Sequence, residues 1–304
     1  MNSEYIGKLM ELAETDRRVI HLLADSGTGY DEMFRRYFPD QIYNFGIAEE
    51  NMVSAAAGMA TAGKIPFVFT AGAFLAYRSL EFIRDDICFQ DLNVKVVGMG
   101  SGLSWSSLGP THHTTEDVSA LRALPNLMIL SASTPNMVRA CVQKAYEHVG
   151  PVYIKIEMNK EKEFFPDECA IGEGGMDVVR EGSDLLVFTT GSILEEVMDA
   201  SEKLSEAGKC VEVVNVTAIK PFDNKKAAEL MADFDRIYTI EEHNVYGGLG
   251  SILAETVAYG GLNKKIVPIG LEDRFAEGYG TLKNVRKFNG LDAESLYKKI
   301  TETL

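Results

Sequence analysis

A carboxylate at the start of an apolar helix is the feature of this sequence best suited to chemistry. The motif Gly46-Ile47-Ala48-Glu49-Glu50 follows a short predicted strand and opens a helix of small and apolar residues. A Glu in that position is partly removed from water and prefers to share a proton, as an acid or base catalyst must. The residues alone also allow a second interpretation, in which Glu49 and Glu50 are first-turn acids favoured by the helix dipole.

A second group of candidates lies in a turn further along the chain, Gly109-Pro110-Thr111-His112-His113. Histidine can accept or donate a proton near neutral pH, so both histidines are candidates for proton transfer or for contact with a polar substrate. A lone His in a loop is usually structural, and this motif therefore needs its context.

Three further residues could hold a flat ligand. Phe74 and Tyr77 are three residues apart, which puts two rings on one face of an α-helix, where a heterocycle can stack; the same spacing also suits core packing. Asp25 follows the first predicted strand, and the carboxyl ends of parallel strands are where α/β sheets bind ligands. A turn-forming Asp before Ser-Gly is an equal alternative for Asp25.

A regular alternation of strands and helices must position these residues. The apolar runs predict strands at 19–24, 66–69, 94–98, 127–130, 152–156, 185–188, 211–214, 236–240 and 266–270. Amphipathic stretches between them predict helices near 48–62, 74–90, 115–122, 135–148, 192–206, 223–232, 248–258 and 292–302. Near-continuous apolar strands separated by helices are typical of mostly parallel sheets covered by helices. We therefore predict two consecutive α/β domains, 1–158 and 183–304, with a linker at 159–182.

Composition narrows the class of protein. The chain has 304 residues, 46% of them hydrophobic, and a net charge of -15, which argues against nucleic acid or an anionic membrane surface as a partner. The four cysteines are far apart and are expected to be reduced thiols. The start of the chain lacks a signal-peptide pattern, and no apolar run reaches the roughly 18 residues of a membrane span, so we expect a cytoplasmic protein.

The motifs at Glu49, Phe74 and His112, in this order and spacing, resemble the C-terminal half of transketolase and of 1-deoxyxylulose-5-phosphate synthase. These are thiamine-diphosphate enzymes, and the half concerned comprises a pyrimidine-binding domain and a C-terminal domain. The segment from Thr239 to Gly250 extends the resemblance into the second predicted domain, so that it covers nearly the whole chain.

The resemblance implies a role for each candidate. Glu49 would hydrogen-bond the aminopyrimidine of thiamine diphosphate and activate the cofactor, and His112 would contact a substrate oxygen and transfer protons. The other residues implied to lie near the cofactor are Phe74, Tyr77, Asp25 and Ile47. Of the family's aromatic triplet this chain keeps the second and third positions, while the first is Ala71. His113, next to His112, is a further candidate for substrate contact.

The substrate half of the pattern departs from the family. Leu108 stands where the family has an Asp that binds a sugar hydroxyl, Gly100 where transketolase has a His for the sugar phosphate, and Met158 where a phosphate-binding Arg is expected. Lys155 and Lys160 lie near enough to replace that Arg. Trp105, with its serine neighbours, could supply an aromatic wall and hydroxyl donors. We therefore expect small sugar substrates other than the usual pentose and hexose phosphates.

The sequence also lacks the Gly-Asp-Gly motif through which such enzymes hold Mg²⁺ and the diphosphate, and it groups no metal ligands of its own. The resemblance therefore implies an N-terminal partner subunit that carries Gly-Asp-Gly and a following Asn, in an α2β2 heterotetramer.

Three other functions stay open at this stage. The chain could be the β subunit of the first component of a 2-oxo acid dehydrogenase, or a decarboxylating enzyme like the synthase. It could be a scaffold without catalysis, an interpretation supported only by the substrate-side departures. It could also be a plain nucleotide-binding protein, for which Gly247-Gly248-Leu249-Gly250 is a weak and incomplete signal.

Overall fold

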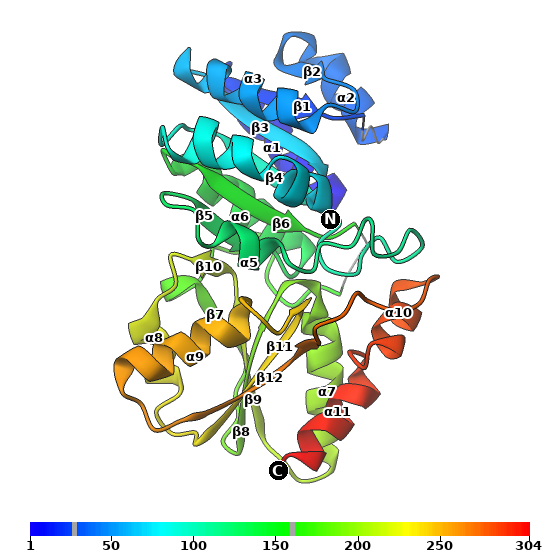
Figure 1. The fold of residues 1–304 in the computed structure, drawn as a ribbon, viewed down its shortest axis with the longest axis vertical. Coiled ribbons are helices and arrows are strands. Elements are labelled where there is room, and N and C mark those ends of the chain that lie inside the picture. The colour runs from blue at the N-terminus through cyan, green and yellow to red at the C-terminus, as the bar shows by residue number, and fades with distance from the viewer. Residues whose placement is uncertain (26–28, 159–161) are drawn as a thin grey trace.

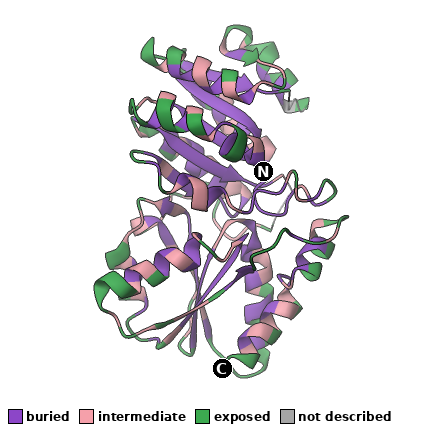
Figure 2. Ribbon diagram, viewed as in Figure 1, coloured by how far each residue is buried: buried purple, intermediate pink, exposed green. Residues whose placement is uncertain are grey.

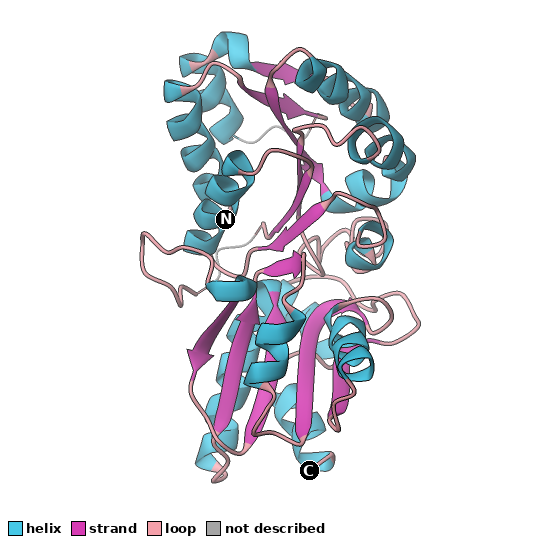
Figure 3. Cartoon of the chain, turned by 90° about the vertical axis from the view of Figure 1, so that its left-hand side faces the viewer, coloured by secondary structure: helices cyan, strands magenta, loops and turns pink. Residues whose placement is uncertain are grey.

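The chain folds into two α/β halves stacked along its long axis (Figure 1). The computed structural model describes residues 1–25, 29–158 and 162–304. Each half has one sheet with helices packed on both faces (Figure 3), which confirms the predicted fold class. None of the helices in these ranges is long and apolar enough to cross a membrane.

The first sheet is almost entirely parallel, and its four central strands are fully buried. As far as the described residues go, it has seven strands, and all neighbours run parallel except β10, which pairs antiparallel with β5. The strands are mostly apolar because both faces are covered, and Figure 2 shows how thoroughly the central strands are buried. In spatial order they are β10 (Ala218–Lys220), β5 (Met128–Ser131), β6 (Val152–Ile156), β4 (Lys95–Met99), β3 (Ile65–Ala71), β1 (Val19–Leu23) and β2 (Ile42–Asn44).

Helices cover the two faces of this sheet as two separate hydrophobic clusters. One face is packed by α1 (Asn2–Thr15), α2 (Gly29–Tyr37) and α6 (Pro135–Glu147). The other is packed by α3 (Glu49–Thr61), the π-helix η2 (Phe74–Arg78), α4 (Leu80–Phe82), the π-helix η3 (Ile83–Cys88) and α5 (Asp117–Leu121). A short 3-10 helix, η1 (Pro39–Gln41), joins α2 to β2.

The second sheet follows the same plan on a smaller scale. Its strands, in spatial order across the described chain, are β12 (Lys265–Leu271), β11 (Arg236–Asn244), β8 (Leu185–Thr190), β9 (Val211–Val216) and the antiparallel edge strand β7 (Met176–Arg180). One face is covered by α7 (Leu194–Glu206), α10 (Leu282–Phe288) and α11 (Ala293–Glu302), and the other by α8 (Asn224–Leu230) and α9 (Leu249–Gly260). The 3-10 helices η4 (Glu173–Gly175) and η5 (Gly191–Ile193) precede β7 and α7.

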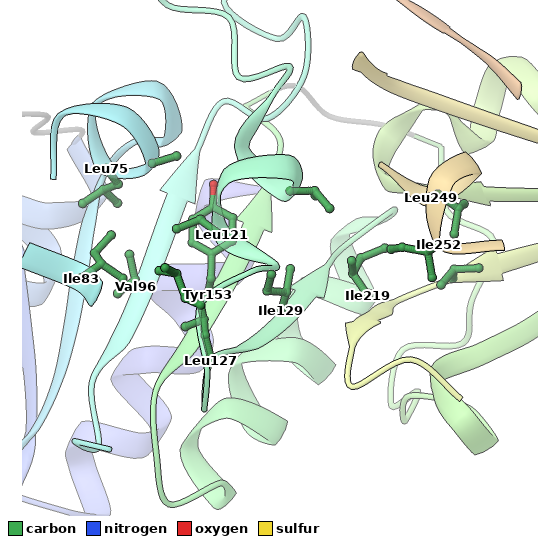
Figure 4. Close-up of a cluster of buried hydrophobic side chains, with 14 of the residues drawn as sticks. Leu75, Ile83, Val96, Leu121, Leu127, Ile129, Tyr153, Ile219, Leu249 and Ile252 are labelled. Carbon is green, nitrogen blue, oxygen red and sulfur yellow. The ribbon is translucent and has the colours of Figure 1, made fainter. Parts of the chain in front are cut away.

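Two strands lie where the expected division of the chain did not place a strand. The predicted linker 159–182 contains β7, which belongs to the second sheet, so its last residues are not irregular. The short strand β10 comes from the second half but joins the first sheet. Ile219 of β10 packs with Ile129 of β5 in a hydrophobic cluster that continues to Leu249 in the second half (Figure 4). One of the hydrophobic clusters therefore spans both halves, and the domain boundaries themselves stay a prediction.

A buried polar cluster also joins the halves. Arg286 donates to Glu242 (Nε to Oε1, 2.5 Å) and to Ser192 (Nη2 to Oγ, 3.1 Å), and forms an ion pair with Glu196. Glu157, just after β6, is 1% exposed, and neither of its carboxylate oxygens has a hydrogen-bond partner of good geometry among the described residues. Burial, together with the nearby charge of Glu242, raises the pKa of Glu157 to about 7.

We expect Glu157 to make the stability of the chain fall as the pH rises. The unfolded chain loses this proton near pH 4.5, whereas the folded protein keeps it to about pH 7. The folded state therefore binds more protons in this window, and the free energy of unfolding should decrease across it by up to about 3 kcal/mol. Urea unfolding between pH 4.5 and 8 measures this slope. Glu157→Gln should flatten it, and the exposed Glu81→Gln should not; equal slopes for both variants would contradict the assignment.

Candidate active site

The candidate residues follow neighbouring parallel strands of the first sheet. Asp25 lies just after β1, and Glu49, Phe74 and His112 follow β2, β3 and β4 in turn. Because these strands are parallel and pair directly in the order β4-β3-β1-β2, their carboxyl ends meet at one edge of the sheet. The fold therefore gathers the predicted residues along one edge.

Glu49 is the first residue of α3 and is 1% exposed. The turn before it is held by Asn44, whose Oδ1 accepts from the backbone N–H of Gly46 (2.8 Å) and of Asp25 (3.3 Å). Gly46 has a φ of 66°, a left-handed conformation that glycine adopts without strain. The turn at Asn44 thus positions the buried Glu49 carboxyl at the sheet edge and holds Asp25 next to it. Ile47, between Asn44 and Glu49 in the sequence, is 77% exposed.

Arg78 links Glu49 to Phe74. Its Nη1 donates to Glu49 Oε2 at 2.5 Å, and its guanidinium carbon lies 4.5 Å from the centre of the Phe74 ring. A planar group with hydrogen donors at its edge therefore already fits between the carboxylate and the ring. Arg78 was not among the residues predicted from the sequence. Its position four residues after Phe74 is the one sequence feature that could have indicated a contact between the two.

Tyr77 makes different contacts from Phe74. The segment is a π-helix, in which Ser79 N–H bonds to Phe74 C=O, and a spacing of three residues does not bring two rings to one face as it would in an α-helix. The Tyr77 hydroxyl instead donates to Glu116 Oε2 (2.8 Å) and accepts from the backbone N–H of Glu116 (2.9 Å). The expected shared face is thus corrected, and a cofactor contact by Tyr77 stays a prediction.

His112 lies in the loop 101–115, beside Phe74. The two rings are 5.2 Å apart and nearly edge to face, and the Trp105 ring is 6.0 Å from His112 on the same loop. Thr111 Oγ1 and His112 Nδ1 are 2.9 Å apart. Phe74, His112 and Trp105 therefore form a run of neighbouring rings that begins next to Glu49.

His113 points into the protein. It is 2% exposed, and neither ring nitrogen has a hydrogen-bond partner among the residues described here. Burial lowers the pKa of His113, against the opposing effect of Glu242 and Glu116, which favours the neutral ring at physiological pH. This position does not favour the predicted substrate contact, which stays a prediction.

The substrate-side departures have a structural cause at Gly100. A Cβ added there would clash with Nε1 of Trp105, and the φ of 78° disfavours any side chain. Trp105 Nε1 donates to Met99 C=O at 3.4 Å. The indole thus occupies the space that a side chain at position 100 would need.

Among the described residues, the other departures do not place the expected cation in this region. Leu108 is 45% exposed, and Met158 is half-buried, with its N–H donating to Ser104 Oγ (3.1 Å). Lys155 cannot replace the phosphate-binding Arg as suggested, because it is buried and its Nζ is 2.7 Å from Asp117 Oδ1. Lys160 lies outside the described residues.

Comparison with known proteins assigns both halves of the chain to known domain families. The transketolase pyrimidine-binding domain matches residues 4–159, and the transketolase C-terminal domain matches residues 174–296. The chain belongs to the transketolase family. This confirms the resemblance predicted from the motifs and, because the relatives are transketolase subunits, makes the chain part of a transferase.

Two sequence relatives and one solved structure show which part of the family it resembles. One of the subunits of the apulose-4-phosphate transketolase of Actinobacillus succinogenes is 34% identical, over 97% of this chain and 97% of its own length. The 1-deoxy-D-xylulose-5-phosphate synthase of Carboxydothermus hydrogenoformans is 33% identical over 99% of this chain but only 49% of its own length. A split-gene transketolase, described as an inactive β4 tetramer, superposes with a TM-score of 0.90 at 31% identity, covering 99% of this chain and 97% of its own.

The packing of Trp105 over Gly100 can be tested by measuring the free energy of unfolding of variants. Gly100→Ala combines a left-handed backbone with a clash and should cost about 3 kcal/mol of unfolding free energy. Gly208→Ala is a matched control, because Gly208 has a similar φ of 80° but nothing within 4 Å of the added Cβ, and it should cost about 1 kcal/mol. In a double-mutant cycle with Trp105→Ala, part of the Gly100→Ala cost should disappear. Equal costs at Gly100 and Gly208 would contradict the predicted clash.

Proposed function

We propose that this chain is the C-terminal subunit of a split, thiamine-diphosphate-dependent transketolase-like enzyme that transfers a two-carbon ketol unit from a ketose donor to an aldehyde acceptor. The observation that carries the proposal is the buried Glu49 carboxyl, which the guanidinium of Arg78 links to the face of Phe74 at the carboxyl edge of the sheet. A flat heterocycle with a ring nitrogen at its edge fits this pair, as the guanidinium of Arg78 illustrates.

The residues of this chain would hold the pyrimidine part of thiamine diphosphate. The cofactor supplies a thiazolium carbon that adds to a carbonyl and stabilises negative charge there. Glu49 would hydrogen-bond the pyrimidine ring nitrogen, since a carboxyl removed from water can share a proton with a weak heterocyclic base. Phe74 would pack the ring, Asp25 and Ile47 would lie beside it at the strand ends, and Tyr77 would support the site through Glu116.

His112 would serve the substrate. Thr111 Oγ1 lies within hydrogen-bond distance of His112 Nδ1, so His112 Nε2 is the nitrogen that would contact a substrate oxygen. The ring lies between Phe74 and Trp105, and a proton held there would be next to both the cofactor and the substrate.

The remaining half of the cofactor site would come from an N-terminal partner subunit. That subunit would carry the Gly-Asp-Gly and Asn pattern, bind Mg²⁺ and the diphosphate, and assemble with this chain as an α2β2 heterotetramer. Three observations support this proposal: the sequence contains no Gly-Asp-Gly, the chain spans nearly all of the apulose-4-phosphate transketolase relative and about half of the synthase, and Ile47 is exposed beside Glu49. The cytoplasmic location expected from the sequence stays a prediction.

The substrates would be small sugars other than the common pentose and hexose phosphates. Trp105 fills the space over Gly100, Leu108 and Met158 replace polar contacts, and Lys155 is engaged by Asp117. The transketolase relative of Actinobacillus succinogenes is named for apulose 4-phosphate. A synthase-like decarboxylating reaction is the second candidate, because the synthase matches 99% of this chain; release of CO₂ from pyruvate would identify it.

The role of Glu49 can be tested on the complex reconstituted with the partner, thiamine diphosphate and Mg²⁺. Glu49→Gln keeps the shape but not the proton-sharing group, so ketol transfer should fall by about 100-fold or more. Glu50→Gln, the neighbouring and less buried acid, is the control and should stay within a few-fold of wild type. Full activity of the Glu49→Gln complex would refute cofactor activation by this residue.

The substrate assignment can be tested with xylulose 5-phosphate as donor. The loss of the phosphate and hydroxyl contacts should hold kcat/KM for this sugar far below the typical enzyme range of about 10⁴–10⁸ M⁻¹s⁻¹. The same complex should use at least one other ketose more efficiently. An ordinary kcat/KM with xylulose 5-phosphate would show that the altered residues do not change specificity.

A further inference from the structure

Arg78 occupies the place that the proposed function gives to the pyrimidine ring. Its guanidinium lies over the Phe74 ring at 4.5 Å and donates to Glu49 at 2.5 Å. A guanidinium and an aminopyrimidine share two properties, a flat face that stacks on an aromatic ring and nitrogen atoms at the edge that bond a carboxyl group. The two groups would therefore compete for the same pair of contacts.

We propose that Arg78 is a displaceable placeholder for the cofactor's pyrimidine ring: it masks Glu49 and Phe74 until the ring takes its place. This inference rests on the proposed function, because it takes Glu49 and Phe74 as the pyrimidine site. It assigns Arg78 a role that precedes the reaction, as a residue that must leave for the cofactor to bind.

The burial of the two partners shows which of them moves. The Glu49 side chain is 2% exposed and fixed at the first turn of α3, whereas the Arg78 side chain is 39% exposed. Arg78 is also the last residue of the π-helix η2, and Ser79 after it has left helical geometry (φ -97°, ψ 16°). Arg78 can therefore swing into solvent without repacking the core, while Glu49 cannot.

The charges explain why a placeholder is useful. A buried carboxylate without a partner is costly, and Arg78 offsets that cost when no other group bonds Glu49. The exchange is feasible because the pyrimidine ring would offer Glu49 and Phe74 the same two contacts that Arg78 gives up, so the buried carboxyl would not be left without a partner. The cofactor affinity of the wild-type complex would thus include the cost of displacing Arg78.

The experiment measures thiamine diphosphate binding rather than turnover. Isothermal titration calorimetry, with thiamine diphosphate added to the reconstituted complex in the presence of Mg²⁺, measures the dissociation constant of the cofactor. It compares wild type with Arg78→Ala and Arg78→Met, which both lose the competing cation. Both should bind thiamine diphosphate about three- to tenfold more tightly. Arg84→Ala is the matched control, since Arg84 is 63% exposed and pairs with its neighbour Asp85, and its affinity should match wild type. The Met variant keeps the aliphatic stem in case the Ala variant folds poorly.

A second background separates competition from a general effect on the fold. In Glu49→Gln complexes the charge partner of Arg78 is gone, so Arg78→Ala should tighten binding less than it does with Glu49 present. Unchanged or weaker binding by both Arg78 variants, with a wild type that binds, would overturn the placeholder role alone. No binding by the wild-type complex would overturn the proposed function and this inference with it.

Discussion

The burial of the Glu49 carboxyl at the carboxyl edge of a parallel sheet is the constraint on which the site depends. A carboxyl group at the surface would be solvated and could not share a proton with a weak base. Its burial requires α3 to start directly at the sheet edge, which the left-handed Gly46 and the Asn44 side chain bring about. Burial also requires a compensating partner, and Arg78 supplies it. The burial of Glu49, the start of α3 at the sheet edge and the Arg78–Glu49 ion pair therefore depend on one another.

The second half contributes to the site by bracing the loop that carries His112 and Trp105. Leu103 of that loop is buried in the hydrophobic cluster of the second half, and its N–H donates to Glu242. Ser106 and Gly280 exchange two hydrogen bonds, Oγ to C=O at 2.8 Å and N–H to C=O at 3.1 Å. The loop extends along the junction of the two halves toward α10 (Figure 1). A half that holds none of the proposed catalytic groups can thereby set the position of one of them.

The sequence predicts those parts of the fold in which the hydrophobic pattern of a segment matches its burial in the structure. Strands β4 and β6 were predicted to within a residue, because a parallel strand covered on both faces is apolar at most of its positions. The three-residue β10 was missed, since it carries no periodic signal and gains its partner from the other half of the chain. The predicted helix at 74–90 is there, but its π-helical turns change which side chains meet, and spacing rules for α-helices fail there.

The site shows the same limit at the level of single residues. The motifs made Glu49 and His112 candidates, because each belongs to a string of several residues that resembles the family pattern, and their roles stay predictions. They did not identify Arg78, whose contacts depend on the π-helix, nor the pairing of Lys155 with Asp117, which removes that lysine from the set of available cations. Gly100 and Trp105 show why such residues must be considered together. The absence of a side chain at Gly100 does not leave an empty space, because the indole of Trp105 fills it.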